Sequence, residues 1–63
     1  MKKQNKYQYL YVLQGYYSYG WEDLTQIDKS ESMAFSKIRQ DKRAYEENEG
    51  GRYRIVSRRE LNV

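Results

Sequence analysis

The sequence predicts a small α+β domain in which three antiparallel strands form one sheet and a single helix covers one face. Two aromatic and branched runs, at 7–14 and 21–27, flank a segment bracketed by glycines, as in a hairpin. A polar stretch that ends at two glycines has helical spacing, and an alternating run at 52–61 closes the chain. The element order is therefore ββαβ, and the simplest sheet has strand order 2-1-3.

Length and composition exclude several classes of protein. The chain has 63 residues, no cysteine and no histidine, which removes disulfides, zinc thiolates and the commonest general base. Charged residues make up 33% of the chain but the net charge is only +3, which favours solubility without demanding a nucleic-acid partner. We expect residues 1–6 to be a flexible basic tail and residues 7–63 to be one domain without a cofactor. No apolar run follows Met1-Lys2-Lys3, and no stretch could span a bilayer, so we expect a cytoplasmic protein that does not bind membranes.

The first predicted strand, 7–14, is apolar on both faces, which is typical of a central strand. One face carries Tyr9, Tyr11 and Leu13, and the other carries Leu10, Val12 and Gln14. Residues 15–20, from Gly15 to Gly20, are predicted to form the hairpin loop or a bulged turn. In the second strand, one face would carry Trp21, Asp23 and Thr25, and the other Glu22, Leu24 and Gln26.

The helix is predicted to begin near Asp28 and to end near Asn48. Asp28 followed three residues later by Glu31 forms a capping-box pattern, and Ser30 is a competing N-cap. Ala34, Ile38 and Tyr45 lie on one stripe, which Asp41 interrupts. Gly50 and Gly51 would terminate the helix. In the last strand, Tyr53 and Ile55 alternate with Arg52, Arg54 and Val56.

No arrangement of residues predicts catalysis. Glu22 and Asp23 are neighbours on a strand, so their side chains would point to opposite faces and could not act as an acid–base pair. The serines have no histidine partner, and the glycine-bracketed segment lacks the Gly-Lys-Ser/Thr ending of a phosphate loop. We therefore expect no enzymatic activity and no metal site.

Aromatic residues near the hairpin favour a protein partner. Tyr16, Tyr17, Tyr19 and Glu22 are the predicted contacts, since consecutive tyrosines cannot all point inward. Trp21, the only tryptophan, is expected in the small core between sheet and helix. An exposed edge strand could also pair with a second copy and give a homodimer.

The alternative is weak nucleic-acid binding by a basic last strand. Its candidate contacts are Arg52, Arg54, Arg58 and Arg59, which could neutralise phosphates while nearby tyrosines stack on bases. The competing interpretation is that these arginines line a solvated face or pair with the carboxylates of Glu22, Glu46, Glu47 and Glu49.

Three segments resemble a family of small uncharacterised proteins encoded by phages, prophages and other mobile elements. They are Tyr11-Val-Leu-Gln-Gly-Tyr-Tyr-Ser-Tyr-Gly-Trp-Glu-Asp-Leu-Thr25, Tyr45-Glu-Glu-Asn-Glu49 and Tyr53-Arg-Ile-Val-Ser-Arg-Arg59, and the Gln-Gly…Gly-Trp-Glu-Asp stretch is the most specific part. That family has no assigned activity. The resemblance therefore implies a mobile-element accessory protein that binds a host or phage macromolecule, and it implies no mechanism.

Overall fold

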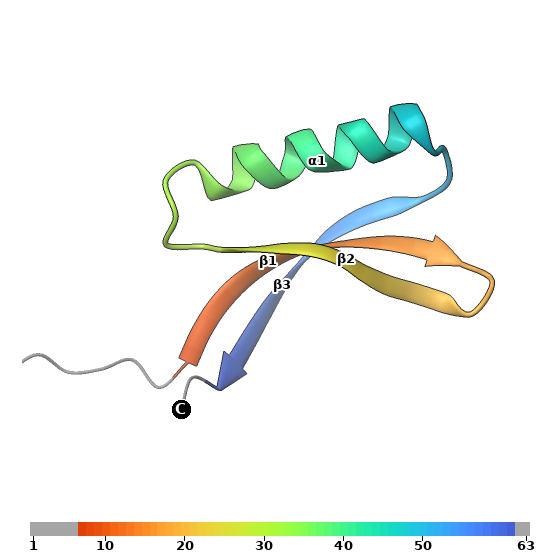
Figure 1. Ribbon diagram of the computed structural model, residues 1–63. Helices are drawn as coiled ribbons and strands as arrows, with labels where there is room; N and C mark the ends of the chain where they lie inside the picture. The colour runs from red at the N-terminus through yellow and green to blue at the C-terminus, as the bar shows by residue number, and fades with distance from the viewer. Residues whose placement is uncertain (1–6, 62–63) are drawn as a thin grey trace, which may run out of the picture.

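The computed structural model describes residues 7–61, which form a three-stranded sheet and one helix (Figure 1). The elements are β1 (Tyr7–Tyr17), β2 (Gly20–Asp28), α1 (Ala34–Asn48) and β3 (Tyr53–Leu61). The sheet is antiparallel with strand order β2-β1-β3, and α1 lies across one of its faces. The predicted fold class, element order and strand order are confirmed. The predicted tail, residues 1–6, and the last two residues of the predicted domain lie outside the described part.

Strand β1 is central and contributes to both faces of the sheet, as predicted. Its Tyr11 faces the helix, where its ring centroid lies 5.2 Å from that of Phe35. Across to β3, Leu13 is paired with Ile55, so these side chains also face α1. Within residues 7–61, the buried apolar side chains are those of Leu10, Val12, Leu13, Ala34 and Ile38. A core this small has little stability to spare.

The hairpin loop is shorter than the predicted segment 15–20. Gly15 lies inside β1, and the pairing of Tyr17 with Gly20 leaves only residues 18 and 19 as the turn. Gly20 adopts φ 115°, a conformation that glycine takes without a steric penalty. Glycine suits position 15 of this strand, because the Tyr17 ring and Leu24 occupy the space that a side chain would need.

A β-bulge in β2 overturns the predicted faces of that strand. Leu13 pairs with Thr25 but Gln14 pairs with Asp23, so Leu24 is an extra residue. The alternation shifts by one residue at this point. Trp21 and Asp23 therefore face away from the helix, while Thr25 faces it.

The predicted start of the helix is wrong by about one and a half turns. Asp28 still belongs to β2, and its neighbour Lys29 donates its backbone N–H to the carbonyl of Tyr9 at 2.9 Å. This pairing holds Asp28 in the sheet. Its carboxylate instead accepts the N–H of Ser30 at 2.8 Å, and its carbonyl accepts that of Glu31 at 3.0 Å, forming a turn.

The predicted C-terminal end of the helix is confirmed. Helix α1 ends at Asn48, and Gly50 follows with φ 71°, in the left-handed region that ends many helices. Lys42 and Tyr45 are half-buried against the sheet. Asp41, next to Lys42, is exposed. Asp41 therefore does not interrupt the buried stripe, because Lys42 occupies that position and its long stem covers apolar surface.

Two residues with positive φ flank α1, Met33 before it and Gly50 after it, and glycine is expected to be the more stable residue at both positions. Met33, the residue before α1, has φ 57° and forms no side-chain cap, so its Cβ already opposes this backbone conformation. We expect Met33→Gly to raise the free energy of unfolding by up to about 1 kcal/mol, and Gly50→Ala to lower it by about 1 kcal/mol. Urea unfolding followed by circular dichroism measures both. If both substitutions changed the free energy of unfolding in the same direction, the left-handed conformation of Met33 or of Gly50 would be contradicted.

Candidate functional site

The face of the sheet opposite α1, here called the open face, carries an aromatic–arginine stack of Tyr16, Trp21 and Arg54. Tyr16 and Trp21 are directly opposite on β1 and β2, and their rings meet edge to face at 5.1 Å. From β3, the Arg54 guanidinium lies 4.0 Å from the centre of the Trp21 ring. Tyr16 is 51% exposed and Trp21 is 37% exposed. All three strands therefore contribute to one accessible surface.

Next to this stack, a network of hydrogen-bonded polar side chains holds Arg54 in place. Gln14, which is 8% exposed, accepts a hydrogen bond from Arg54 Nε at 2.7 Å and donates one to Asp23 at 2.8 Å. Asp23 in turn accepts two hydrogen bonds from Arg58, at 2.5 and 3.1 Å. Among the described residues no buried side-chain nitrogen or oxygen lacks a partner. The network thus ties the three strands together and holds Arg54 in the orientation that stacks on Trp21.

The hydrogen bonds from Arg58 and Gln14 lower the pKa of Asp23 from 3.8 to about 2. Because this pKa is lower in the folded chain than in the unfolded one, the ion pair stabilises fully above about pH 4, and this stabilisation is lost as the pH falls toward 2. The carboxylate is 46% exposed, so water screens the pair.

We expect Asp23→Asn to lower the free energy of unfolding by about 0.5–1 kcal/mol at neutral pH and to have almost no effect near pH 2. Denaturant unfolding across this pH range measures the difference. Asp41→Asn, at an exposed position of α1 without an ion pair among the described residues, is the matched control and should change little at either pH. An Asp23→Asn effect that persisted at pH 2 would show that the ion pair is not its source.

The structure divides the predicted partner contacts between two faces. Tyr16 belongs to the open face, but Tyr17 turns toward the helix side, where its ring stacks with that of Tyr19 at 5.7 Å. Tyr19 donates its hydroxyl hydrogen to Glu22, and this hydrogen bond raises the pKa of Tyr19. The four residues therefore do not form one surface.

Trp21 lies on the open face and not in the core, so its predicted placement is wrong. The cause is the bulge at Leu24: without it, Trp21 and Thr25 would share the helix-facing side. Trp21 joins the candidate site for this reason.

The predicted basic strand is also divided. Arg52 precedes β3, and its carbonyl accepts the N–H of Tyr16 at 2.9 Å. Arg54 and Arg58 share the open face, whereas Arg59 points to the other side and stacks over Tyr7 at 4.4 Å. The register also places three carboxylates on the open face, those of Asp23, Asp28 and Glu60.

The polar network joins two predicted nucleic-acid contacts, Arg54 and Arg58, to Gln14 and Asp23, which the sequence did not single out as binding residues. Gln14 follows Leu10 and Val12 on one face of β1 and is the buried polar residue there, and Arg54 and Arg58 share a face at a spacing of four. A polar residue at such a position requires hydrogen-bonding partners when it is buried. A buried glutamine on a central strand therefore indicates polar partners on both neighbouring strands.

Within residues 7–61, no group of three or more acidic side chains is placed to hold a metal ion. In the same part of the chain, α1 is not a candidate for crossing a bilayer. No protein-family model, curated protein or solved structure matches this chain.

Proposed function

We propose that this protein is a non-enzymatic interaction module that binds a protein partner through the aromatic–arginine stack. The observation that carries the proposal is that Tyr16, Trp21 and Arg54 are stacked on one accessible face. Tyr, Trp and Arg are the residue types that contribute most binding energy at protein interfaces. The strands and the network around Gln14 orient these side chains before a partner arrives, which reduces the entropy lost on binding.

The charges of the open face favour a protein over a nucleic acid. Arg58 is paired with Asp23, and Asp28 and Glu60 share the face, so little positive potential is left for phosphates. The resemblance to mobile-element proteins completes the proposal: an accessory protein that acts in the cytoplasm on a host or phage protein.

Selection from a displayed library of random peptides tests the proposal. We expect the wild-type protein to retain binders that Trp21→Ala and Arg54→Gln lose. Tyr9→Ala is the matched control, because Tyr9 is as exposed as Tyr16, at 51%, but points to the opposite face. A selection in which every binder survives on Trp21→Ala, or in which the binders lost on Trp21→Ala are lost equally on Tyr9→Ala, would exclude this surface.

Nucleic-acid binding is the second candidate, and the stacking of Arg54 on Trp21 is the observation in its favour. Fluorescence anisotropy of labelled single- and double-stranded oligonucleotides, at about 50 and 200 mM salt, separates the two candidates. We expect no binding at either concentration. Micromolar binding that weakens steeply with salt would favour the nucleic-acid function instead.

A further inference from the structure

The outer edge of β3 has backbone hydrogen-bonding groups that no described strand uses. The bond from Tyr16 N–H to the Arg52 carbonyl sets the alternation of the β1–β3 ladder. Even-numbered residues of β3 therefore bond to β1. The N–H and C=O groups of Tyr53, Ile55, Ser57 and Arg59 point to the free edge. Such an edge is a template for an added strand.

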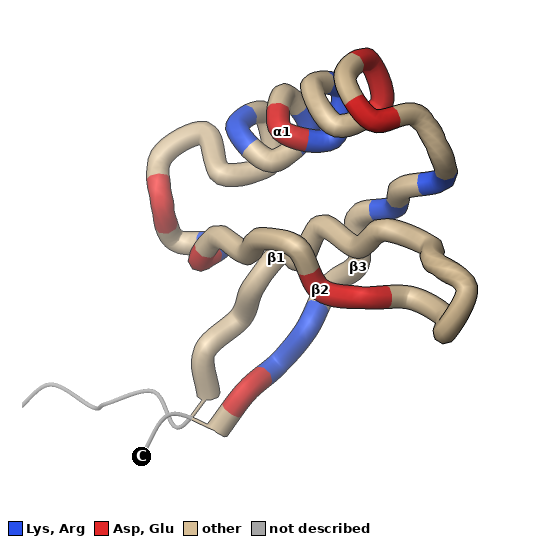
Figure 2. Tube along the Cα trace, turned by 45° about the vertical axis from the view of Figure 1, so that its right-hand side comes forward, with Lys and Arg blue, Asp and Glu red and all other residues tan. Residues whose placement is uncertain are grey.

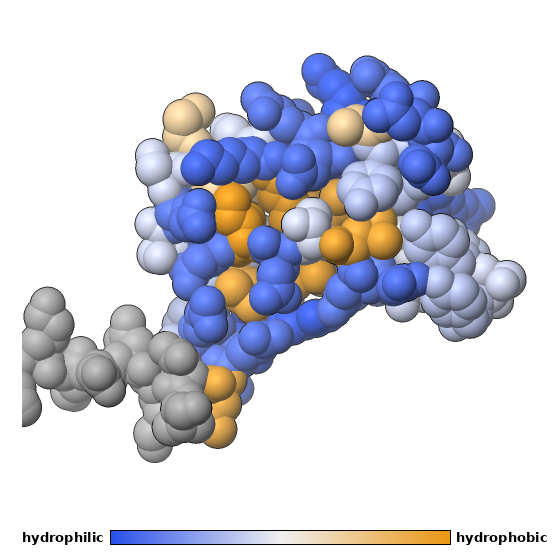
Figure 3. Space-filling view, in the orientation of Figure 1, coloured by the Kyte–Doolittle hydropathy of each residue, from blue (hydrophilic) through white to orange (hydrophobic). Residues whose placement is uncertain are grey.

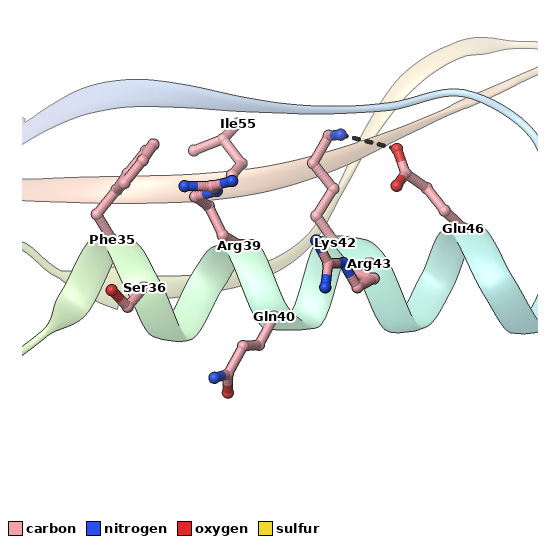
Figure 4. A pocket seen from close by; sticks show the side chains of 8 residues that line it. All are labelled: Phe35, Ser36, Arg39, Gln40, Lys42, Arg43, Glu46 and Ile55. Carbon is pink, nitrogen blue, oxygen red and sulfur yellow. Dashed lines mark hydrogen bonds and ion pairs between the residues drawn. The ribbon is translucent and has the colours of Figure 1, made fainter.

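A groove runs beside this edge, between α1 and β3 (Figure 4). Its apolar surface comes from Phe35, which is 46% exposed, and from the half-buried Ile55. Figure 3 shows apolar side chains between the polar surfaces of the helix and the sheet. The side chains of Phe35, Arg39 and Lys42 extend toward β3, while that of Gln40 turns away. The groove therefore presents apolar surface beside the free edge of β3.

The rim of the groove is basic and partly unpaired. Lys42 binds Glu46 at 2.7 Å, but no described carboxylate lies within ion-pair distance of Arg39 or Arg43. The Arg39 guanidinium lies over the Phe35 ring at 5.8 Å. Basic positions outnumber acidic ones along β3, which carries three arginines and Glu60, whereas the charged positions of the opposite edge strand, β2, are acidic (Figure 2). The β3 side of the molecule is thus complementary to negative charge.

We propose that an extended acidic segment of a partner protein adds to the β3 edge as a fourth strand. On the side facing α1, an apolar side chain would enter the groove at Phe35 and Ile55, and acidic side chains would meet Arg39 and Arg43. A second copy of this chain fits less well, because two β3 edges would bring basic rows together. The proposal goes beyond the proposed function, since this surface and the open face are separate.

A synthetic peptide, Thr-Glu-Thr-Ile-Thr-Glu-Thr with blocked ends, is the probe. Alternation places its Glu, Ile and Glu on one face of a strand. We expect hydrogen exchange followed by NMR to show new protection at the amides of Ile55, Ser57 and Arg59, which face the free edge. The amides of Arg54, Val56 and Arg58 already bond to β1 and should change little.

Three controls make the test specific. N-methylation of the peptide amides that face β3 should abolish binding, because it removes the strand hydrogen bonds. Replacing both Glu residues of the peptide by Lys, or combining Arg39→Glu with Arg43→Glu, should weaken binding about tenfold or more. Trp21→Ala should leave it unchanged, which separates this proposal from the proposed function.

Several results would overturn the proposal. They are the absence of new protection at millimolar peptide, binding that survives N-methylation, and perturbations confined to the open face. Protection of the β3 edge amides that rises with protein concentration alone would assign this edge to a second copy.

Discussion

Replacing Leu13 with alanine is expected to lower the free energy of unfolding by about 2–5 kcal/mol. Leu13 is 0% exposed and faces α1 from the central strand, and it is one of five buried apolar residues in the described part of the chain. A domain of this length has a total free energy of unfolding of roughly 3–9 kcal/mol. The substitution should therefore remove a large share of the total free energy of unfolding, and it would unfold the protein if that total lies near the low end of the range.

Thermal and urea unfolding measure this effect, and Leu61→Ala is the matched control. Leu61 is 60% exposed at the end of β3, so the same change of side chain should alter the free energy of unfolding by less than about 0.5 kcal/mol. Comparable losses for the two variants would contradict the position of the core.

Gly15→Val is expected to destabilise the protein by about 1–3 kcal/mol. A Cβ at Gly15 would lie 3.1 Å from Leu24 Cδ1 and from Tyr17 Cε2 and Oη, closer than ordinary van der Waals contact. Valine adds two further methyl groups to this space. The Tyr17 ring would have to leave its position over Gly15, and its stacking with Tyr19 would be disturbed.

A second substitution distinguishes this steric cause from others. In a Tyr17→Ala background the ring is gone, so Gly15→Val should cost clearly less than in the wild-type protein. Valine also has a higher strand propensity than glycine, which lowers the cost of Gly15→Val in both backgrounds and cancels in the coupling energy. Chemical denaturation of the four proteins in this cycle gives the coupling energy. A coupling energy near zero would mean that Tyr17 does not restrict position 15.

The strands and the end of the helix could be predicted because their signals are local. Alternation in β1 and β3 and the two glycines after Asn48 fix backbone geometry through nearest neighbours. The start of the helix could not be predicted in this way. The capping pattern at Asp28 competes with strand pairing to β1, and this pairing is a tertiary interaction.

The candidate site was predicted only in part, and one bulge explains most of the difference. The tyrosine cluster predicts Tyr16 as a contact, whereas Trp21 is expected in the core because it is the only tryptophan. Strict alternation would also place Trp21 on the same face as Thr25, which faces the helix. The extra residue, Leu24, reverses that assignment, and no turn residue marks the bulge in the sequence. Arg54 was identified as basic, yet its contacts with Gln14 and Trp21 depend on a register between three strands.

The central claim is that Trp21 and its stacking partners form the surface that binds a protein. Trp21 is the only tryptophan, so its indole N–H gives one unambiguous NMR signal. The decisive measurement is a titration of isotopically labelled protein with a peptide from the library selection. We expect the Trp21 indole and the side chains of Gln14 and Arg54 to shift together, while the amides at the β3 edge stay unchanged. A bound peptide that left the Trp21 signal in place would contradict the claim.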